Sequence, residues 1–405
     1  MVLAGAGMST AISTFNFDEI IERRHTDSGK WGRFSSDPDV IPMWTADMDF
    51  RSPPAVIDAL HERVEHGVFG YGYGGWTHRP EALLNVLSER MATRYDWQVQ
   101  PDDFMFVPNI VSALYGMCRS VGEEGCHILV QTPNYWPFFS GADAANRVML
   151  KIPAVASANG AGLRYEIDFD ALEAAITPRT HLFMFSNPHN PVGRAYERWE
   201  LERLADICLR HDLTICSDEI HCDLTYNGHE HIPMATLSPE VAARTITFMA
   251  PSKTFNVPGL KLGFAIAQNH ELLQRLESFY MSIGVSTGVM GYVAAQAAYE
   301  HGQPWLTALL DYLTRNRDYA FDFVANNLPG VVPVKPEATY LMFMDCREMA
   351  VDGDPTEFFL NKAKVALSGG FDSQGFPAYT RLNFGCPHSV LVEALDRMKA
   401  ALADQ

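Results

Sequence analysis

Residues 182–193 read LFMFSNPHNPVG, an apolar run that passes directly into a loop rich in asparagine and proline. The run 182–185 has the length and composition of a buried strand, and the polar residues after it mark its end. Two X-Pro steps stiffen the loop, and Gly193 permits a tight turn. Taken alone, Asn187 and Asn190 are compatible with an ordinary turn, although the motif is longer than a turn requires.

The same pattern of a short apolar run followed by a reactive side chain recurs twice further along the chain. Residues 213–216 are followed by Asp218, and residues 246–250 are followed by Lys253. In open α/β sheets, ligands bind in the crevice beyond the carboxyl ends of the strands. We therefore expect the amide of Asn190, the carboxylate of Asp218 and the amine of Lys253 to meet at one rim of a sheet.

Residues 104–267 alternate short apolar runs with amphipathic helical stretches, which is typical of an α/β fold with a mainly parallel sheet. The chain has 405 residues, 47% of them hydrophobic, and is too long for one comfortable core. We expect an N-terminal segment (1–55) that joins a smaller α+β domain, a large domain (56–290), and the C-terminal small domain (291–405). The small domain is predicted to contain one long helical region up to about residue 326, strand-like segments at 340–344 and 379–384, and a closing helix at 390–402.

Charge and cysteine content limit the partners and the compartment. The formal net charge of −18 argues against nucleic acid and anionic membranes, since both require clustered Lys and Arg. No run approaches 18 consecutive apolar residues, so no membrane-spanning helix is expected. Seven cysteines, an odd count without a tight pairing pattern, favour a reduced compartment, and we expect a cytoplasmic protein. His221, Cys222, His229 and His231 match no standard zinc spacing, so no metal site is expected.

Lys253 and Asp218 form the candidate reactive pair. A lysine removed from water beside a cationic group loses its proton more readily, which makes it first a nucleophile and later a base. A carboxylate ~4 Å from a cationic ring nitrogen, at an effective dielectric constant of ~20, attracts it by about 4 kcal/mol, or roughly three pKa units. Alone, Lys253 would be interpreted as a surface lysine and Asp218 as a helix N-cap.

Four further positions could complete a binding site. Tyr135 follows a predicted strand end and could stack on a flat ring, or pack in the core. A helix that begins near residue 110 would present the free amides of Ile110 and Val111, a natural cradle for phosphate. Ser252, next to the lysine, could add a hydroxyl donor. Arg381 could bind a substrate carboxylate with two hydrogen bonds, although a lone arginine is more often exposed.

This set of residues resembles the fold-type I enzymes that use pyridoxal 5′-phosphate (PLP), within the class I/II aminotransferase superfamily. More narrowly, it is similar to the MalY/PatB group of cystathionine β-lyases. The similar segments run in family order from about residue 15 to the C-terminus: IPMWTADMDF (41–50), FGYGY (69–73), NPHNPVGR (187–194), SDEIH (217–221), SKTFN (252–256), ATYL (338–341) and RLNFGCP (381–387). Each segment alone is modest support, and together they cover nearly the whole chain.

The resemblance implies a PLP transferase fold, with a sheet of the seven-stranded type, and roles for individual residues. Lys253 would form the Schiff base, Asp218 would contact the pyridine nitrogen, and Asn190 the phenolic oxygen. Tyr135 would stack on the ring and Arg381 would bind the substrate carboxylate. The catalytic set would be Lys253, Asp218 and Tyr135.

The same resemblance adds a substrate set and a partner. Arg381, Asn190, Trp44, Ala46 and Tyr340 would contact the amino-acid substrate. Tyr71, in a glycine-rich loop that lacks the Lys-Ser/Thr of a P-loop, would reach the phosphate in the neighbouring subunit, so that a homodimer is the expected active form.

Three positions differ from the pattern of typical aminotransferases or of some C–S lyases. His221 stands where many aminotransferases carry a tyrosine on the phenolic oxygen, and histidine there favours the C–S lyase branch. Lys261 replaces a phosphate-binding arginine, so this cofactor contact becomes a point charge. Trp136 stands where some C–S lyases have a second tyrosine, so an acid role at that position is lost.

Three functions are compatible with the sequence. The first is a C–S β-lyase that cleaves L-cystathionine or a related cysteine S-conjugate into thiol, pyruvate and ammonia. The second is an aminotransferase on the same scaffold, in which Lys253 returns the proton to the cofactor. The third is a regulatory binding protein with incidental lyase activity, for which no particular surface is marked.

Overall fold

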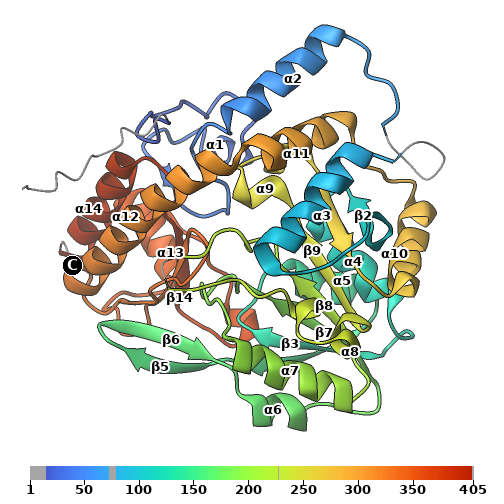
Figure 1. Ribbon diagram of the computed structural model, residues 1–405. Coiled ribbons are helices and arrows are strands. Elements are labelled where there is room, and N and C mark those ends of the chain that lie inside the picture. Colours follow the sequence, from blue (N-terminus) through green and yellow to red (C-terminus); the bar gives the residue numbers. More distant parts are fainter. Residues whose placement is uncertain (1–14, 73–78, 227, 404–405) are drawn as a thin grey trace, which may run out of the picture.

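The structure, a computed structural model, describes residues 15–72, 79–226 and 228–403, and its centre is a seven-stranded sheet (Figure 1). The strand order is β2-β10-β9-β8-β7-β3-β4. These strands are β2 (Phe104–Val107), β10 (Gly263–Ile266), β9 (Thr245–Met249), β8 (Thr214–Asp218), β7 (Thr180–Ser186), β3 (His127–Thr132) and β4 (Val148–Pro153). β10 runs antiparallel to both neighbours and the other pairs are parallel, which confirms the predicted fold class.

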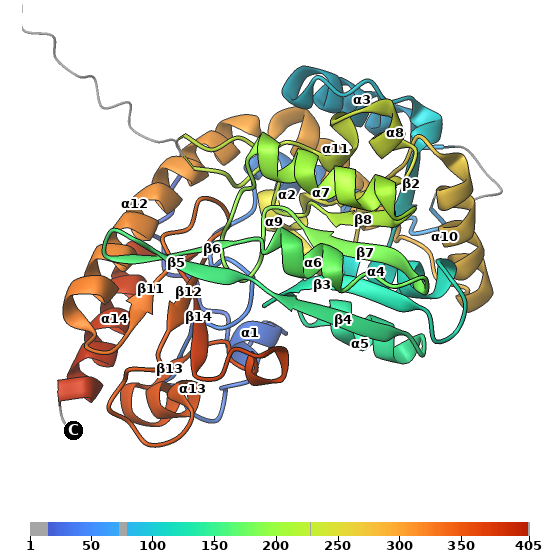
Figure 2. The same ribbon diagram turned by 90° about the horizontal axis from the view of Figure 1, so that it is seen from below.

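Both faces of this sheet are buried, because successive side chains of a strand point to opposite sides. Leu182 and Met184 of β7 belong to one core with the helices α4, α5 and α10, whereas Phe183 and Phe185 belong to another core with α6 and α7. Figure 2 shows α6 and α7 lying across the strands. The helices are α4 (Ile110–Ser120), α5 (Pro137–Ala144), α10 (His270–Ile283), α6 (Phe169–Ala174), α7 (Arg198–Arg210) and α8 (Pro239–Ala242).

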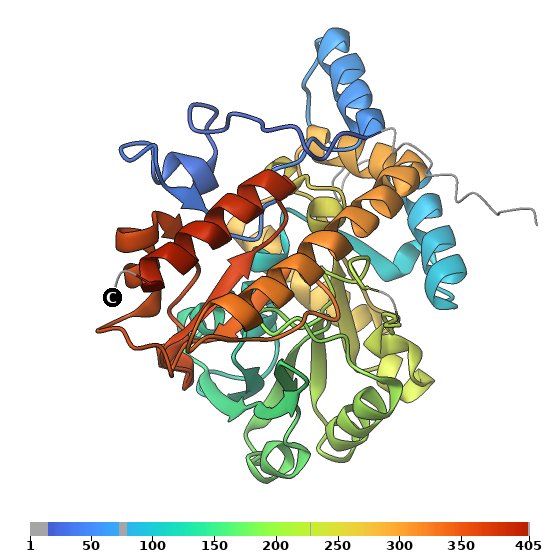
Figure 3. The same cartoon turned by 90° about the vertical axis from the view of Figure 1, so that its left-hand side faces the viewer.

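The C-terminal part of the chain forms a smaller sheet of order β11-β12-β14, covered by long helices (Figure 3). Its elements are β11 (Val332–Pro333), β12 (Leu341–Asp345), β14 (Tyr379–Asn383), α11 (Val289–His301), α12 (Gln303–Asn327), α13 (Pro355–Phe358) and α14 (His388–Ala403). β1 (Ile41–Pro42) pairs in parallel with β13 (Val365–Ala366), which attaches the N-terminal segment to this part. The domain boundaries near residues 55 and 290 stay predictions.

The remaining elements connect or flank these layers. They are α1 (Gly29–Gly32), α2 (Pro54–His66), α3 (Glu81–Tyr95), α9 (Pro251–Thr254) and the hairpin of β5 (Val155–Asn159) and β6 (Gly162–Glu166). Within the described ranges, none of the helices is both long enough and apolar enough to cross a membrane.

The long helical region predicted between residues 291 and 326 consists of two helices, α11 and α12, which meet at Gly302. A Cβ at Gly302 would lie 2.4 Å from the carbonyl oxygen of Ala298 and 2.6 Å from the ring of Phe255. Only glycine permits this close approach, and it brings α11 against the segment that follows Lys253.

Candidate active site

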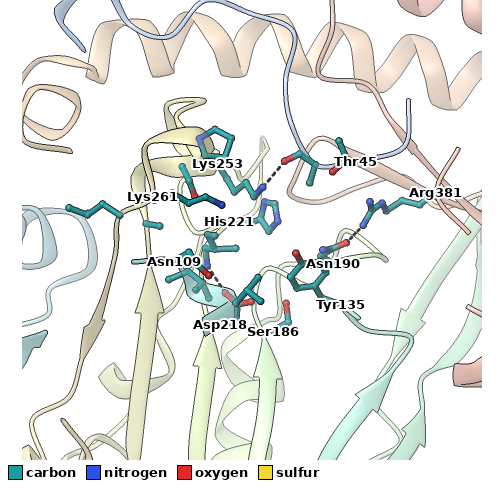
Figure 4. A pocket seen from close by; sticks show the side chains of 18 residues that line it. Thr45, Asn109, Tyr135, Ser186, Asn190, Asp218, His221, Lys253, Lys261 and Arg381 are labelled. Carbon is teal, nitrogen blue, oxygen red and sulfur yellow. Dashed lines mark hydrogen bonds between the residues drawn. The ribbon is translucent and has the colours of Figure 1, made fainter. Parts of the chain in front are cut away.

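A cavity of about 220 Å³ lies at the carboxyl ends of the central strands (Figure 4). The adjacent strands β7, β8 and β9 lead to Asn190, Asp218 and Lys253, which meet in the cavity as the sequence predicts. β3, beside β7, leads to Tyr135. β10 is antiparallel and therefore begins at this same edge, which places Lys261 in the lining just before the strand.

The cavity brings together eleven of the fourteen residues that the sequence singled out. Those in the lining are Ala46, Ile110, Val111, Tyr135, Asn190, Asp218, His221, Ser252, Lys253, Lys261 and Arg381. Trp44 lies just outside and contributes its carbonyl, which accepts a hydrogen bond from Arg381. Tyr340 is buried behind the wall, with its ring centroid 6.0 Å from that of His221. Tyr71 is fully exposed and does not line the cavity of its own chain.

The Lys253 amine lies in the cavity and donates a hydrogen bond to the carbonyl oxygen of Ala46 at 2.6 Å. Burial lowers the pKa of Lys253 to about 8, while Asp47 opposes this shift and Arg381 adds to it. Because this pKa is much closer to neutrality than that of an ordinary lysine, a useful fraction of the amine is uncharged and nucleophilic.

Asp218 is the last residue of β8 and is 3% exposed. Burial raises the pKa of its carboxyl to about 7, and the amide of Ile220 donates a hydrogen bond to it at 3.3 Å. A cation placed against this carboxylate would lower the pKa again and keep it ionised. The site is therefore built for a positively charged group.

His221 and Arg381 have polar atoms without a partner within the described part of the chain. Burial lowers the pKa of His221 to about 3, so its ring is neutral, and its Nδ1 makes no hydrogen bond there. Burial also lowers the pKa of Arg381 to about 10, and its Nε makes no hydrogen bond there. A carboxylate would compensate this buried guanidinium.

Arg381 orients the amide of Asn190. Its Nη1 donates to Asn190 Oδ1 at 2.7 Å, although the two residues lie on β14 and on the loop after β7 (Figure 4). This contact leaves the Nδ2 of Asn190 as a donor for a ligand in the cavity. Gly193, with φ of 73°, holds the same loop, since its carbonyl accepts hydrogen bonds from the amides of Glu337 and Ala338.

The N-terminus of α4 forms another side of the cavity. Asn109 caps this helix by accepting from the amide of Ser112 at 2.9 Å, and the cavity is lined by Ile110 and Val111. The first amides of a helix have no partner within it, and the helix dipole favours an anion there. Ser252 and Lys261 in the same lining add a hydroxyl and a positive charge.

Residues 44–48 form a ridge of carbonyl groups that the sequence did not reveal, and each carbonyl accepts a side-chain hydrogen bond. Asn383 donates to the carbonyls of Thr45 and Asp47, at 2.6 and 3.0 Å. Asn256 donates to the carbonyl of Met48 at 3.1 Å. This ridge holds the Ala46 carbonyl in place against Lys253. Asn256 and Asn383 lie within the similar segments 252–256 and 381–387, but their contacts with a segment more than 200 residues away could not be inferred.

The cavity residues fit PLP, the cofactor that the sequence resemblance implies. PLP requires a lysine, an acid at the ring nitrogen, a donor to the phenolic oxygen, a ring partner and a phosphate site. Lys253, Asp218, the Nδ2 of Asn190 and the ring of Tyr135 would supply the first four, and the N-terminus of α4 would supply the fifth. A cationic ring would compensate the desolvated carboxyl of Asp218. A polar group on the same ring would give the Nδ1 of His221 the hydrogen-bond partner that it lacks within the described part of the chain.

The cavity lies at the C-terminal ends of the strands of a mainly parallel sheet, and it combines a desolvated lysine, a desolvated aspartate and a helix N-terminus. This combination defines an enzyme that binds an anionic cofactor. The buried guanidinium of Arg381 lines the same cavity, where a carboxylate would compensate its charge. The chain belongs to the family of class I and II aminotransferases, which matches residues 38–398.

Individual relatives cover almost the whole chain. Cystathionine beta-lyase PatB of Bacillus subtilis is 37% identical over 395 residues, which cover 96% of this chain and 100% of the relative. The structure of a PLP-bound putative aminotransferase from Clostridium difficile has a TM-score of 0.90 and 35% identity, covering 96% and 100% of the two chains. A PLP-bound C–S lyase from Staphylococcus hominis has a TM-score of 0.86 and 33% identity, covering 97% and 99%.

Asp218 should make the cofactor-free protein less stable as the pH rises. The folded protein holds the Asp218 proton more tightly than the unfolded chain, because its pKa rises from 3.8 to about 7. The associated stability is complete below about pH 4 and is lost as the pH rises to about 7, a total of roughly 4 kcal/mol. Asp218→Asn removes this titration. Urea unfolding of both cofactor-free proteins between pH 4 and 8 should show the variant gaining stability relative to the natural chain.

The exposed Asp170, whose side chain is 93% accessible, provides the control for this experiment. Asp170→Asn should show no comparable change with pH. A constant difference between Asp218→Asn and the natural chain across this range would contradict the raised pKa.

Proposed function

We propose that this chain is a PLP-dependent C–S β-lyase that converts L-cystathionine or a related cysteine S-conjugate into a thiol, pyruvate and ammonia. The observation that carries the proposal is the Lys253 amine, desolvated in a cavity that it shares with Asp218 and Arg381. The names of the relatives support it, since PatB is a cystathionine beta-lyase and the Staphylococcus hominis protein is a C–S lyase.

Each residue has a distinct task in this reaction. Arg381 binds the substrate carboxylate, and Asn190, oriented by Arg381, donates to the phenolic oxygen of the cofactor. PLP supplies an aldehyde that condenses with amines and a ring that accepts the electron pair left by a departing proton. Lys253 removes the proton from the α-carbon, and Asp218 keeps a proton on the ring nitrogen. The C–S bond then breaks, and water completes the release of pyruvate and ammonia.

A single assay separates the lyase from an aminotransferase. The purified protein with PLP is given L-cystathionine without any 2-oxo acid, and pyruvate and free thiol are measured. We expect equal amounts of both products. An absolute requirement for 2-oxoglutarate or another acceptor would replace the lyase proposal with amino transfer, because transfer alone needs a second substrate.

We also propose that the active form is a homodimer in a reduced compartment such as the cytoplasm. Apolar side chains are exposed after α2, where Val68 and Phe69 precede the fully exposed Tyr71. α2 itself stands out from the body of the molecule (Figure 3). A second copy would cover these side chains and give Tyr71 a site to contact. The compartment is supported by the seven cysteines, all of them free and buried.

Mixed dimers test whether Tyr71 acts on the neighbouring site. Tyr71→Ala and Lys253→Ala proteins, each of low activity, are unfolded together and refolded as a mixture. If Tyr71 reaches across, each mixed dimer has one intact site, and about a quarter of the natural activity should return. Mixing Lys253→Ala with Asp218→Asn is the control, because both residues serve the cavity of their own chain. Activity that stays at the level of the control would contradict a contact by Tyr71 across the interface.

A further inference from the structure

A second, outer pocket of about 680 Å³ adjoins the cavity that contains Lys253. Thr45, Tyr135 and Arg381 line both spaces, so they mark the passage between them. A substrate whose carboxylate lies on Arg381 has its α-carbon close to this passage. The group attached to its sulfur therefore has the outer pocket open to it, while the α-carbon faces Lys253.

Aromatic rings form much of the wall of the outer pocket. Trp44, Tyr135, Trp136 and Phe371 contribute to its lining. Trp136 is 55% exposed, an unusual position for so large an apolar ring unless a ligand or a partner covers it. Trp136 is the residue at which the sequence differs from some C–S lyases. It does not line the cavity that contains Lys253.

The walls are held by hydrogen bonds before any ligand enters. Gln374 accepts from the amide of Asn134 at 2.6 Å and donates to its carbonyl at 3.1 Å, which joins the segment of Trp136 to the turn at 372–374. The Nε1 of Trp44 donates a hydrogen bond to the carbonyl of Lys30 at 3.2 Å, and the guanidinium of Arg33 lies 5.0 Å from the centroid of the Trp44 ring. Because these side chains are already held in place, binding a ligand costs little conformational entropy. Flat aromatic walls favour a flat ligand.

We propose that the outer pocket binds the sulfur substituent of the substrate and that Trp136 selects flat aromatic substituents. The inference rests on the proposed lyase activity and narrows its substrate class to cysteine S-conjugates of arylalkyl thiols. The overall reaction is unchanged, with the arylalkyl thiol as the leaving group. Trp136 is a specificity-determining residue in this scheme and takes no part in proton transfer.

Two substrates that differ only in aromaticity test the proposal. S-benzyl-L-cysteine and S-(cyclohexylmethyl)-L-cysteine have groups of similar size, and in both a methylene separates the ring from the sulfur, so the leaving thiols have similar acidity. The natural chain should prefer the benzyl substrate in kcat/KM by roughly three- to tenfold, the range of an aromatic pair. Trp136→Ala should bring this ratio close to one, and Trp136→Phe should restore most of it.

Trp199 supplies the matched control, because it is 54% exposed on α7 and lines neither pocket. Trp199→Ala should keep the natural ratio. A ratio that is near one in the natural chain, or that Trp136→Ala leaves unchanged, would overturn the proposal.

Binding without cleavage separates this inference from the proposed function. In 2-amino-5-phenylpentanoic acid and its cyclohexyl counterpart, a methylene replaces the sulfur, so no thiol can leave. Their dissociation constants, followed by the absorbance of the bound cofactor, should show the same preference and the same dependence on Trp136. If no S-conjugate is cleaved but this binding preference holds, the lyase proposal fails and the outer pocket stands; equal binding of both acids contradicts the outer pocket.

Discussion

Lys253→Ala should lower pyruvate formation from L-cystathionine by about 10⁴-fold or more. In the proposed mechanism, the substitution removes both the amine that holds the cofactor and the base that takes the α-proton, and a positioned base alone contributes roughly 10²–10⁴-fold. Borohydride reduction of the natural protein with PLP should fix the cofactor on the peptide that contains Lys253. The variant should carry no such adduct when the digested proteins are compared by mass spectrometry.

Lys261→Ala is the matched control for this prediction, since Lys261 is the second lysine that lines the same cavity. It should weaken the binding of PLP through the loss of a positive charge near the phosphate site, yet keep the adduct on Lys253. An adduct on Lys261 in the natural protein, or normal activity in Lys253→Ala, would contradict the assignment.

Asp218→Asn should lower kcat/KM by about 10³-fold. A carboxylate ~4 Å from the ring nitrogen, at an effective dielectric constant of ~20, stabilises the protonated ring by about 4 kcal/mol, which corresponds to roughly a thousandfold. Asparagine has the same shape but no charge, so it cannot hold that proton in place. The pH dependence of the absorbance of the bound cofactor would report the loss directly.

This prediction is paired with the opposite effect on stability. The buried carboxyl, with its pKa raised to about 7, disfavours folding of the cofactor-free protein near pH 8, and the amide does not. The same substitution should therefore stabilise the empty protein and impair the enzyme. A variant that keeps natural kcat/KM would show that Asp218 does not interact with the ring nitrogen.

Much of the main cavity could be predicted from local sequence. Asn190, Asp218 and Lys253 each follow or end a short apolar run, and the runs became neighbouring strands β7, β8 and β9. Burial of both sheet faces requires continuous apolar strands, so the point at which each strand ends is visible in the sequence. That the side chains after these strands meet at one edge of the sheet then follows from the α/β pattern.

Other features depend on contacts between distant parts of the chain. Arg381 meets Asn190 across 191 residues, and Asn383 meets Thr45 across 338. Neither pairing produces a periodic pattern in the sequence. Each joins one side chain to one acceptor, whereas a helix or strand that buries one face repeats apolar residues at a regular spacing. For the same reason the sequence marked Trp136 as a departure from a pattern but did not place it in an outer pocket.

The strands of the central sheet and the edge at which the cavity lies could be predicted from the amino-acid sequence, because both depend on hydrophobic runs and on where these runs stop. The same pattern led to Lys253 as the candidate reactive amine. The shifted pKa values of Lys253 and Asp218, the pairing of Arg381 with Asn190 and the aromatic pocket beside them arise from the folded arrangement of the chain. Desolvation and hydrogen bonding act over a few ångströms in space, and folding brings together groups that the chain keeps hundreds of residues apart.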